Sequence, residues 1–127
     1  MIYAYMRVST ETQAERNGTQ AQKVTIDEYA NKNKITITNY FEDLGISGTK
    51  TDRPALLDLL NVLQEGDSVL VLNTSRLWRS DTAKVIIRQE IIKSGADVIS
   101  IEQPNYSINS KDPNEFLINS MMELLDQ

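Results

Sequence analysis

The spacing of apolar residues changes repeatedly between two periods along the chain, and this restricts the fold more than any other feature. Residues 2–8 (IYAYMRV) carry an apolar side chain at every second position, which is typical of a strand. Residues 19–33 space their apolar residues as a helix does. The same change from strand to helix occurs three more times before the printed sequence ends.

The expected strands are residues 2–8, 34–41, 68–72 and 97–101, and the expected helices are residues 19–33, 54–65, 81–94 and 113–127. Pro54 suits the first turn of its helix, and Gly66 and Gly95 suit helix ends. Strands that alternate with helices predict an α/β domain with a mainly parallel central sheet of about four to five strands, flanked by helices.

Composition restricts the chemistry. The 127 residues are enough for one domain, and they include neither cysteine nor histidine, so thiol nucleophiles and imidazole bases are excluded. We expect no cofactor and no metal.

No apolar run is long enough to cross a bilayer, and we expect a cytoplasmic protein without a membrane partner. The net charge of −5 argues against a self-sufficient DNA-binding domain.

The first strand ends in the stretch YMRVST. Side chains two apart in a strand share a face, so Tyr5, Arg7 and Ser9 point the same way, at the edge of the sheet where α/β proteins bind ligands. A serine hydroxyl beside a guanidinium suits attack on a phosphate. The alternative interpretation is a solvated arginine at a strand end, followed by a serine in a turn or a helix cap.

The stretch SRLWRSDT follows the third strand. Arg76 and Arg79 are three apart, so a helical turn would place them on one side, where their repulsion favours an anion between them. The alternative is a solvated basic turn with Trp78 packed beneath it.

Arg53 comes directly before the helix that Pro54 opens, and helix N-termini attract phosphate. It could instead pair with Asp43 or Asp52. Four of the six arginines thus lie at or after the carboxyl ends of strands, which is not expected of random surface charge in an acidic chain.

Three motifs in this order resemble the serine recombinases, the resolvase/invertase family of site-specific DNA recombinases. YMRVST resembles the family's Y-x-R-V-S signature, EDLGISGTKTDRPALLDLL its arginine-bearing loop, and SRLWRS its D-R-L-x-R-like motif. The resemblance runs from Met1 to the end of the printed sequence. The long loop and the S-R-L-W-R variant are more similar to large serine recombinases and transposon recombinases than to small resolvases.

The resemblance implies that Ser9 attacks a DNA phosphodiester and forms a 5′-phosphoseryl link. It implies catalytic roles for Arg7, Arg53, Arg76 and Arg79, and supporting roles for Tyr5, Gln13, Gln20 and Asp43. Small resolvases carry an aspartate where this chain has Ser75, which places any role of that carboxylate in doubt. Two alternatives are a non-catalytic phosphate- or nucleotide-binding module and a metal-dependent nuclease, which needs clustered carboxylates at the rim.

Residues 1–127 are therefore expected to form one catalytic domain, with 113–127 the start of a long helix. Its apolar residues would form a subunit interface: Leu117, Met121, Met122, Leu124 and Leu125. The resemblance implies a homo-oligomer, a dimer and a tetramer, with target DNA recognised mainly by an absent C-terminal region.

Overall fold

The computed structural model describes residues 1–8, 18–44 and 53–108. Its elements are β1 (Ile2–Val8), α2 (Thr19–Lys32), β2 (Ile37–Leu44), α3 (Pro54–Val62), β3 (Ser68–Val71), the 3₁₀ turn η1 (Thr74–Arg76), α4 (Asp81–Ser94) and β4 (Asp97–Ser100). This order confirms the predicted alternation of strands and helices.

The four strands form one parallel sheet in the order β2-β1-β3-β4. Val8 at the end of β1 pairs with Leu44 at the end of β2, and Val71 at the end of β3 pairs with Ser100 at the end of β4. The carboxyl ends of all four strands therefore lie along one edge of the sheet. The predicted mainly parallel sheet is confirmed.

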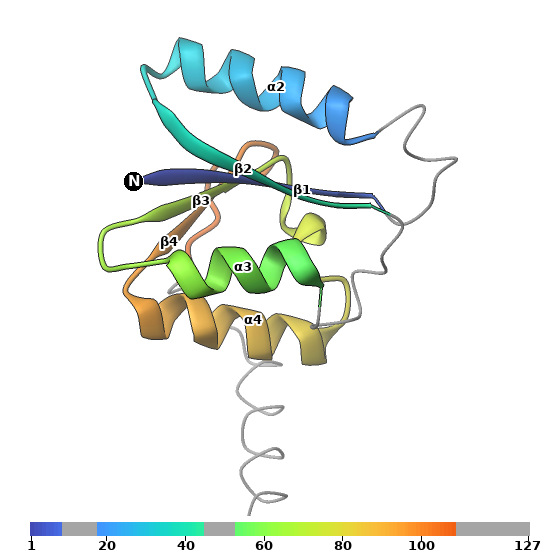
Figure 1. Ribbon diagram of the computed structural model, residues 1–127, viewed down its shortest axis with the longest axis vertical. Coiled ribbons are helices and arrows are strands. Elements are labelled where there is room, and N and C mark those ends of the chain that lie inside the picture. Colours follow the sequence, from blue (N-terminus) through green and yellow to red (C-terminus); the bar gives the residue numbers. More distant parts are fainter. Residues whose placement is uncertain (9–17, 45–52, 109–127) are drawn as a thin grey trace, which may run out of the picture.

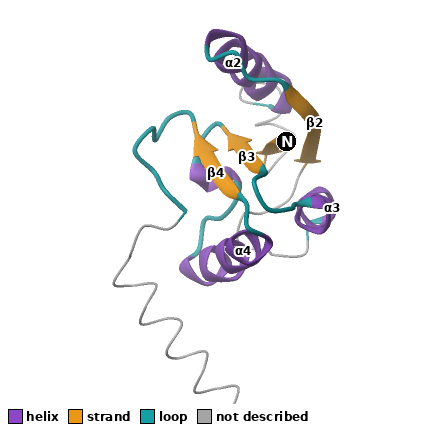
Figure 2. Cartoon of the chain, turned by 90° about the vertical axis from the view of Figure 1, so that its left-hand side faces the viewer, coloured by secondary structure: helices purple, strands orange, loops and turns teal. Residues whose placement is uncertain are grey.

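The helices cover the two faces unequally: α2 lies on one face, and α3 and α4 lie on the other (Figures 1 and 2). Alternate residues of the central strand β1 supply the two cores. Tyr3 and Tyr5 belong to the larger core beneath α3 and α4, and Ala4 and Met6 belong to the smaller one beneath α2. Because β1 is covered on both faces, even its polar Arg7 is fully buried.

Strand β2 begins and ends three residues later than the predicted 34–41. Lys34 has a positive φ of 56°, and the Ile35 amide donates back to the Ala30 carbonyl, so this segment closes α2 before the strand starts. Pairing with β1 then carries β2 on to Leu44, which places Asp43 beside Arg7 in the register.

Helix α3 ends at Val62, four residues before the predicted stop at Gly66. The Asp67 carboxylate accepts from the Gln64 amide at 2.8 Å, and the Asp67 amide donates to the Gln64 carbonyl at 3.0 Å. These two bonds close a turn that leads into β3. Gly66 belongs to that turn and has a φ of +88°, which favours glycine.

The described part of the chain contains no helix that is long and apolar enough to cross a bilayer. Ser9, Gln13 and the expected helix 113–127, with all five predicted interface residues, lie outside the described residues.

Candidate active site

Arg7 lies at the end of β1 with its side chain fully buried. Its Nε donates to the carbonyl of Arg76 at 3.1 Å, and its Nη2 donates to the carbonyl of Ser75 at 2.6 Å. The central strand thus places a guanidinium against the 3₁₀ turn that follows β3. The alternative of a solvated arginine at a strand end is wrong for this residue.

Arg53 reaches the same turn from another element. It is the N-cap residue of α3 and is fully buried. Its Nη1 donates to the Arg76 carbonyl at 2.9 Å, and its Nη2 donates to the Leu77 carbonyl. Its guanidinium also lies 5.6 Å from the centre of the Tyr5 ring. Arg7 and Arg53 therefore share one carbonyl acceptor although 46 positions separate them in the sequence.

Asp43 holds the start of α3. Its carboxylate accepts from the Ala55 amide at 3.0 Å, the Leu56 amide at 3.1 Å and the Tyr5 hydroxyl at 2.7 Å. An ionised carboxylate is well suited to the free amides of a helix N-terminus. Asp43 makes no ion pair with Arg53, so the pairing of these two residues considered from the sequence is wrong. The other candidate partner, Asp52, lies outside the described residues.

Tyr5 connects this cap to the arginines. Burial raises the pKa of its hydroxyl, and the positive charge of Arg53 opposes that shift only in part. The phenol therefore stays neutral and donates its hydrogen bond to Asp43.

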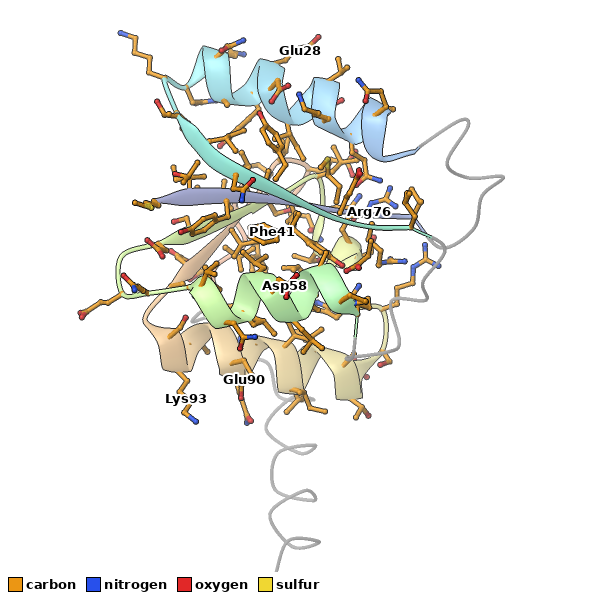
Figure 3. The ribbon with its side chains drawn as sticks, viewed as in Figure 1. Glu28, Phe41, Asp58, Arg76, Glu90 and Lys93 are labelled. Carbon is orange, nitrogen blue, oxygen red and sulfur yellow. The ribbon has the colours of Figure 1, made fainter. Side chains whose placement is uncertain are left out.

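Arg76 is half-buried within the turn and donates from Nη1 to the Arg7 carbonyl at 3.2 Å. Figure 3 labels it where β1 and β2 end. The 3₁₀ turn stops at Arg76, and Arg79 lies exposed beyond it. Trp78 is buried against the core, 6.3 Å from the Tyr106 ring, as the solvated-turn alternative expected.

The electrostatics of this cluster are unfavourable without a ligand. Burial, then the charges of Arg53 and Arg79, lower the pKa of Arg7 to about 10. Burial lowers the pKa of Arg53, and Tyr5 and Asp43 oppose that shift. Burial and then Arg79 lower the pKa of Arg76. Guanidinium groups of like charge thus lie close together, and burial limits their screening by water.

Two donors in the cluster are unused. Among the described residues, the Nε atoms of Arg53 and Arg76 are buried and have no hydrogen-bond partner. No described carboxylate lies within ion-pair distance of either guanidinium. Surplus positive charge and unused N–H donors together define a site that favours an anion.

Gln22 is a contributor that the sequence interpretation missed. It is buried on α2 and donates from Nε2 to the Arg7 carbonyl at 3.0 Å. The predicted Gln20 is exposed on the same helix, because residues two apart point to different sides. The available signal was helical spacing: Gln22, Ile26 and Ala30 are four apart, and all three are buried.

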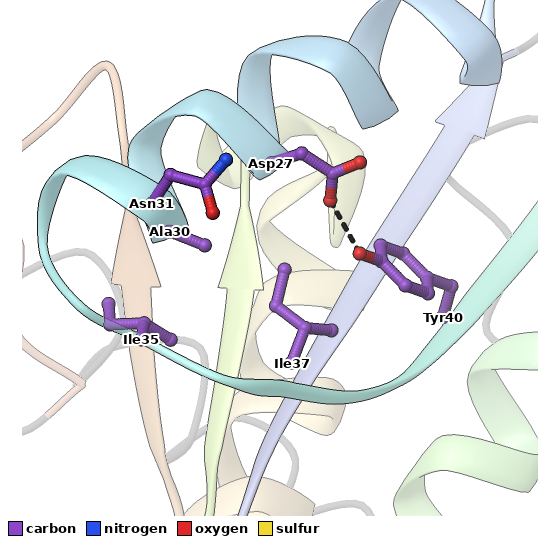
Figure 4. A pocket seen from close by; sticks show the side chains of 6 residues that line it. All are labelled: Asp27, Ala30, Asn31, Ile35, Ile37 and Tyr40. Atoms are coloured by element: carbon purple, nitrogen blue, oxygen red, sulfur yellow. Dashed lines mark hydrogen bonds between the residues drawn. The ribbon is translucent and has the colours of Figure 1, made fainter.

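A second feature lies near the amino end of β2, away from the arginines. It is an open pocket of about 320 Å³ between α2 and β2, lined by Asp27, Ala30, Asn31, Ile35, Ile37 and Tyr40 (Figure 4). Two of its polar groups are hydrogen-bonded to each other: the Tyr40 hydroxyl donates to Asp27, which also pairs with Lys23 outside the pocket. Within the described residues, no three acidic, histidine or cysteine side chains form a group that could hold a metal ion.

The family model "Resolvase, N terminal domain" matches residues 2–127. A resolvase of Clostridium perfringens is 33% identical over 98% of this chain and 61% of its own length. The serine recombinase gin of Escherichia phage Mu is 34% identical over 89% of this chain and 51% of its own length. The N-terminal catalytic domain of TP901-1 integrase superposes with a TM-score of 0.74 at 27% identity, covering 98% of this chain and 93% of that domain.

The chain therefore belongs to the resolvase/invertase family of serine recombinases and corresponds to their N-terminal catalytic domain. The recognition made from the three motifs is confirmed. The chain spans about half to three fifths of the length of the curated relatives it matches.

Proposed function

We propose that this chain is the catalytic domain of a site-specific DNA recombinase that cuts and rejoins strands through a covalent phosphoserine. The observation that carries the proposal is the cluster of the buried Arg7 and Arg53 with the half-buried Arg76, which holds surplus positive charge. Arg7 is two residues before Ser9 in the sequence. A DNA phosphodiester is the anion that a member of this family would bring to that cluster.

In the proposed reaction the Ser9 hydroxyl oxygen attacks the phosphorus of a DNA phosphodiester. A bond forms from the serine oxygen to phosphorus, and the bond from phosphorus to the 3′ oxygen breaks. The serine proton is lost, and the leaving 3′ oxygen gains a proton. The product is a 5′-phosphoseryl link and a free 3′-hydroxyl, and the reverse reaction seals the strand without ATP.

The arginines stabilise the charge that develops on the phosphoryl oxygens. One well-placed donor contributes roughly 3–4 kcal/mol to such a transition state. Arg76 and Arg79, which are not fully buried, approach the phosphate most readily, and Arg7 and Arg53 complete the positive field.

Two of the remaining predicted residues support this arrangement. Tyr5 and Asp43 fix the start of α3, which carries Arg53. Gln13 and Gln20 stay predictions.

The whole protein acts on DNA in the bacterial cytoplasm as dimers and tetramers, and its C-terminal region selects the target site.

The test uses the full-length protein and DNA that carries its recombination site, with denaturing gels to detect covalent complexes. We expect a protein–DNA adduct that persists in EDTA, disappears on Ser9→Ala and is retained on the control Ser94→Ala, a serine at the end of α4. EDTA-sensitive cutting without an adduct would identify a metal-dependent nuclease instead. Phosphate binding without any cutting would identify a binding module.

A further inference from the structure

The loop that leaves β4 holds the turn that carries Arg76. The side-chain oxygen of Gln103 accepts from the Thr74 amide at 2.9 Å and from the Ser100 hydroxyl at 3.0 Å. Thr74 is the first residue of η1, and Ser100 is the buried last residue of β4. Gln103 therefore ties the start of the turn to the sheet.

Glu102 reaches the same turn through a second route. Its amide donates to the Leu72 carbonyl at 2.9 Å, and its carboxylate accepts from the Asn73 amide group at 2.7 Å. The Asn73 side-chain oxygen in turn accepts from the Ser75 hydroxyl. A continuous chain of hydrogen bonds thus runs from Glu102 to Ser75.

The carbonyl groups of this turn are the acceptors for the buried arginines. Ser75 accepts from Arg7, and Arg76 accepts from both Arg7 and Arg53. The geometry of the turn therefore affects three guanidinium groups: those of Arg7 and Arg53, which donate to it, and that of Arg76, which belongs to it. Residues that fix the turn control the cluster without touching a ligand.

Charge gives an independent reason to single out Glu102. Burial, then Arg79, lower the pKa of Arg76, and the negative charge of Glu102 raises it against those effects. Ser75, within the turn itself, carries no charge. Glu102 is the carboxylate that acts on Arg76 in the described part of the chain.

We propose that Glu102, with Gln103, is a positioning residue of the arginine cluster: it fixes Asn73 and Ser75 by hydrogen bonds and balances the charge of Arg76. The bonds set the geometry of the turn, and the charge favours the protonated form of the Arg76 guanidinium. The importance of the cluster for catalysis rests on the proposed function, but the positioning itself does not.

The test measures the reactivity of single arginines in the chain without DNA. Phenylglyoxal modifies neutral, accessible guanidine groups, and peptide mass spectrometry gives a rate for each arginine. Glu102→Gln keeps an oxygen acceptor for Asn73 and removes the charge. We expect Arg76 to react several-fold faster in this variant, because its proton is held less tightly. Arg88 of α4 serves as the internal reference and should keep its rate.

The matched control is Glu90→Gln, which removes an exposed glutamate of α4 (Figure 3). It should leave the Arg76 rate and the melting temperature unchanged. A general loss of structure would accelerate Arg88 as well, so a selective change at Arg76 reports positioning. An Arg76 rate in Glu102→Gln equal to that of the parent would overturn the proposal.

A rescue variant tests the role of the charge. Ser75→Asp places a carboxylate in the turn, where it can accept from the same Asn73 amide group. Added to Glu102→Gln, it should return the Arg76 rate toward that of the parent. A double variant that reacts as fast as Glu102→Gln alone would overturn the charge-balancing role.

A final arm separates this inference from the proposed function. In the full-length protein with its DNA site, Glu102→Gln should slow adduct formation several-fold and leave DNA affinity unchanged. If the parent forms no adduct at all, the proposed recombinase chemistry fails, while the arginine reactivities still decide the role of Glu102.

Discussion

Two groups of charged side chains in this domain are built in opposite ways. On the face of the sheet covered by α2, Lys23 pairs with Asp27 at 2.9 Å, lies 4.7 Å from the centre of the Tyr40 ring, and shares Asp27 with the Tyr40 hydroxyl. At the carboxyl edge of the sheet, Arg7 and Arg53 are crowded together in the interior. The first group joins opposite charges in partial contact with water, and the second buries like charges.

The pKa shifts of the two groups show the difference. Hydrogen bonds from Tyr40 and then from Lys23 lower the pKa of Asp27, so its ionised form is favoured by folding. In the arginine cluster, burial lowers the pKa of each guanidinium, so folding disfavours the charged forms. Perturbation of this unfavourable kind is concentrated at functional sites. The first group suits a structural role, and the second suits the binding of an anion.

Removing Arg76 should produce the largest effect on activity. Arg76→Ala should slow adduct formation by about 10²- to 10³-fold, because a donor to the transition state is lost. The melting temperature should change little, since a poorly compensated charge is also removed. Single-turnover rates on DNA and thermal unfolding measure the two effects. Arg88→Ala on α4 is the matched control; an equal loss of rate there would show that the cluster has no special role.

Asp43 should be the residue of the site on which stability depends most. Asp43→Ala removes the acceptor for two amides at the start of α3 and for the Tyr5 hydroxyl. We expect a loss of about 2–3 kcal/mol in the free energy of unfolding, since buried donors are left unsatisfied. Urea denaturation measures it.

Asp58→Ala is the control for this prediction, because Asp58 is exposed on the same helix (Figure 3). Its effect should stay within about 0.5 kcal/mol, as for most surface substitutions. Similar losses for the two variants would mean that the carboxylate cap does not hold the arginine-bearing helix.

Gln22 and Gln20 offer a smaller and sharper contrast. Gln22→Ala removes a buried donor to the Arg7 carbonyl and should cost about 1 kcal/mol, whereas Gln20→Ala, on the exposed side of α2, should be close to neutral. Gln22→Ala should also slow adduct formation, because Arg7 loses a restraint. The reverse order of effects would favour Gln20 as the supporting residue, as predicted from the motif.

The contrast between these glutamines shows what the sequence could predict. Helical and strand periods located the four strands and three α-helices of the described residues, though not the bounds of β2 and α3. The rule that parallel strands end at one edge brought Arg7, Arg53 and Arg76 to one place. Which glutamine faces Arg7 depends on the rotation of α2, a property of the whole helix. The motif alone therefore favoured Gln20 as the supporting residue. The burial of Ile26 and Ala30 instead identifies Gln22 as the glutamine on the buried side of α2.

The partners of the arginines were beyond prediction for a different reason. Arg53 lies near Asp43 in the fold, yet its guanidinium donates to the carbonyl of Arg76 in η1 and to that of Leu77 directly after it, 23 and 24 positions further along the chain. Every residue has a backbone carbonyl, so the residue type does not reveal which carbonyl groups accept these hydrogen bonds. The sequence could show that positive charge gathers at this edge, but not that a turn of the backbone organises it.

The charge group on α2 should give the smallest effect and completes the comparison. Asp27→Asn removes the ion pair with Lys23, and exposed pairs contribute little. The folded-state pKa of Asp27 is lowered, so its contribution is present above the carboxyl's unfolded pKa of about 3.9 and disappears as the pH falls through the folded value. Parent and variant should thus differ slightly in stability at pH 7 and converge in acid. High salt should also reduce the difference, since it screens exposed charges. A large, salt-independent loss would show that this group, too, is a buried network on which the domain depends.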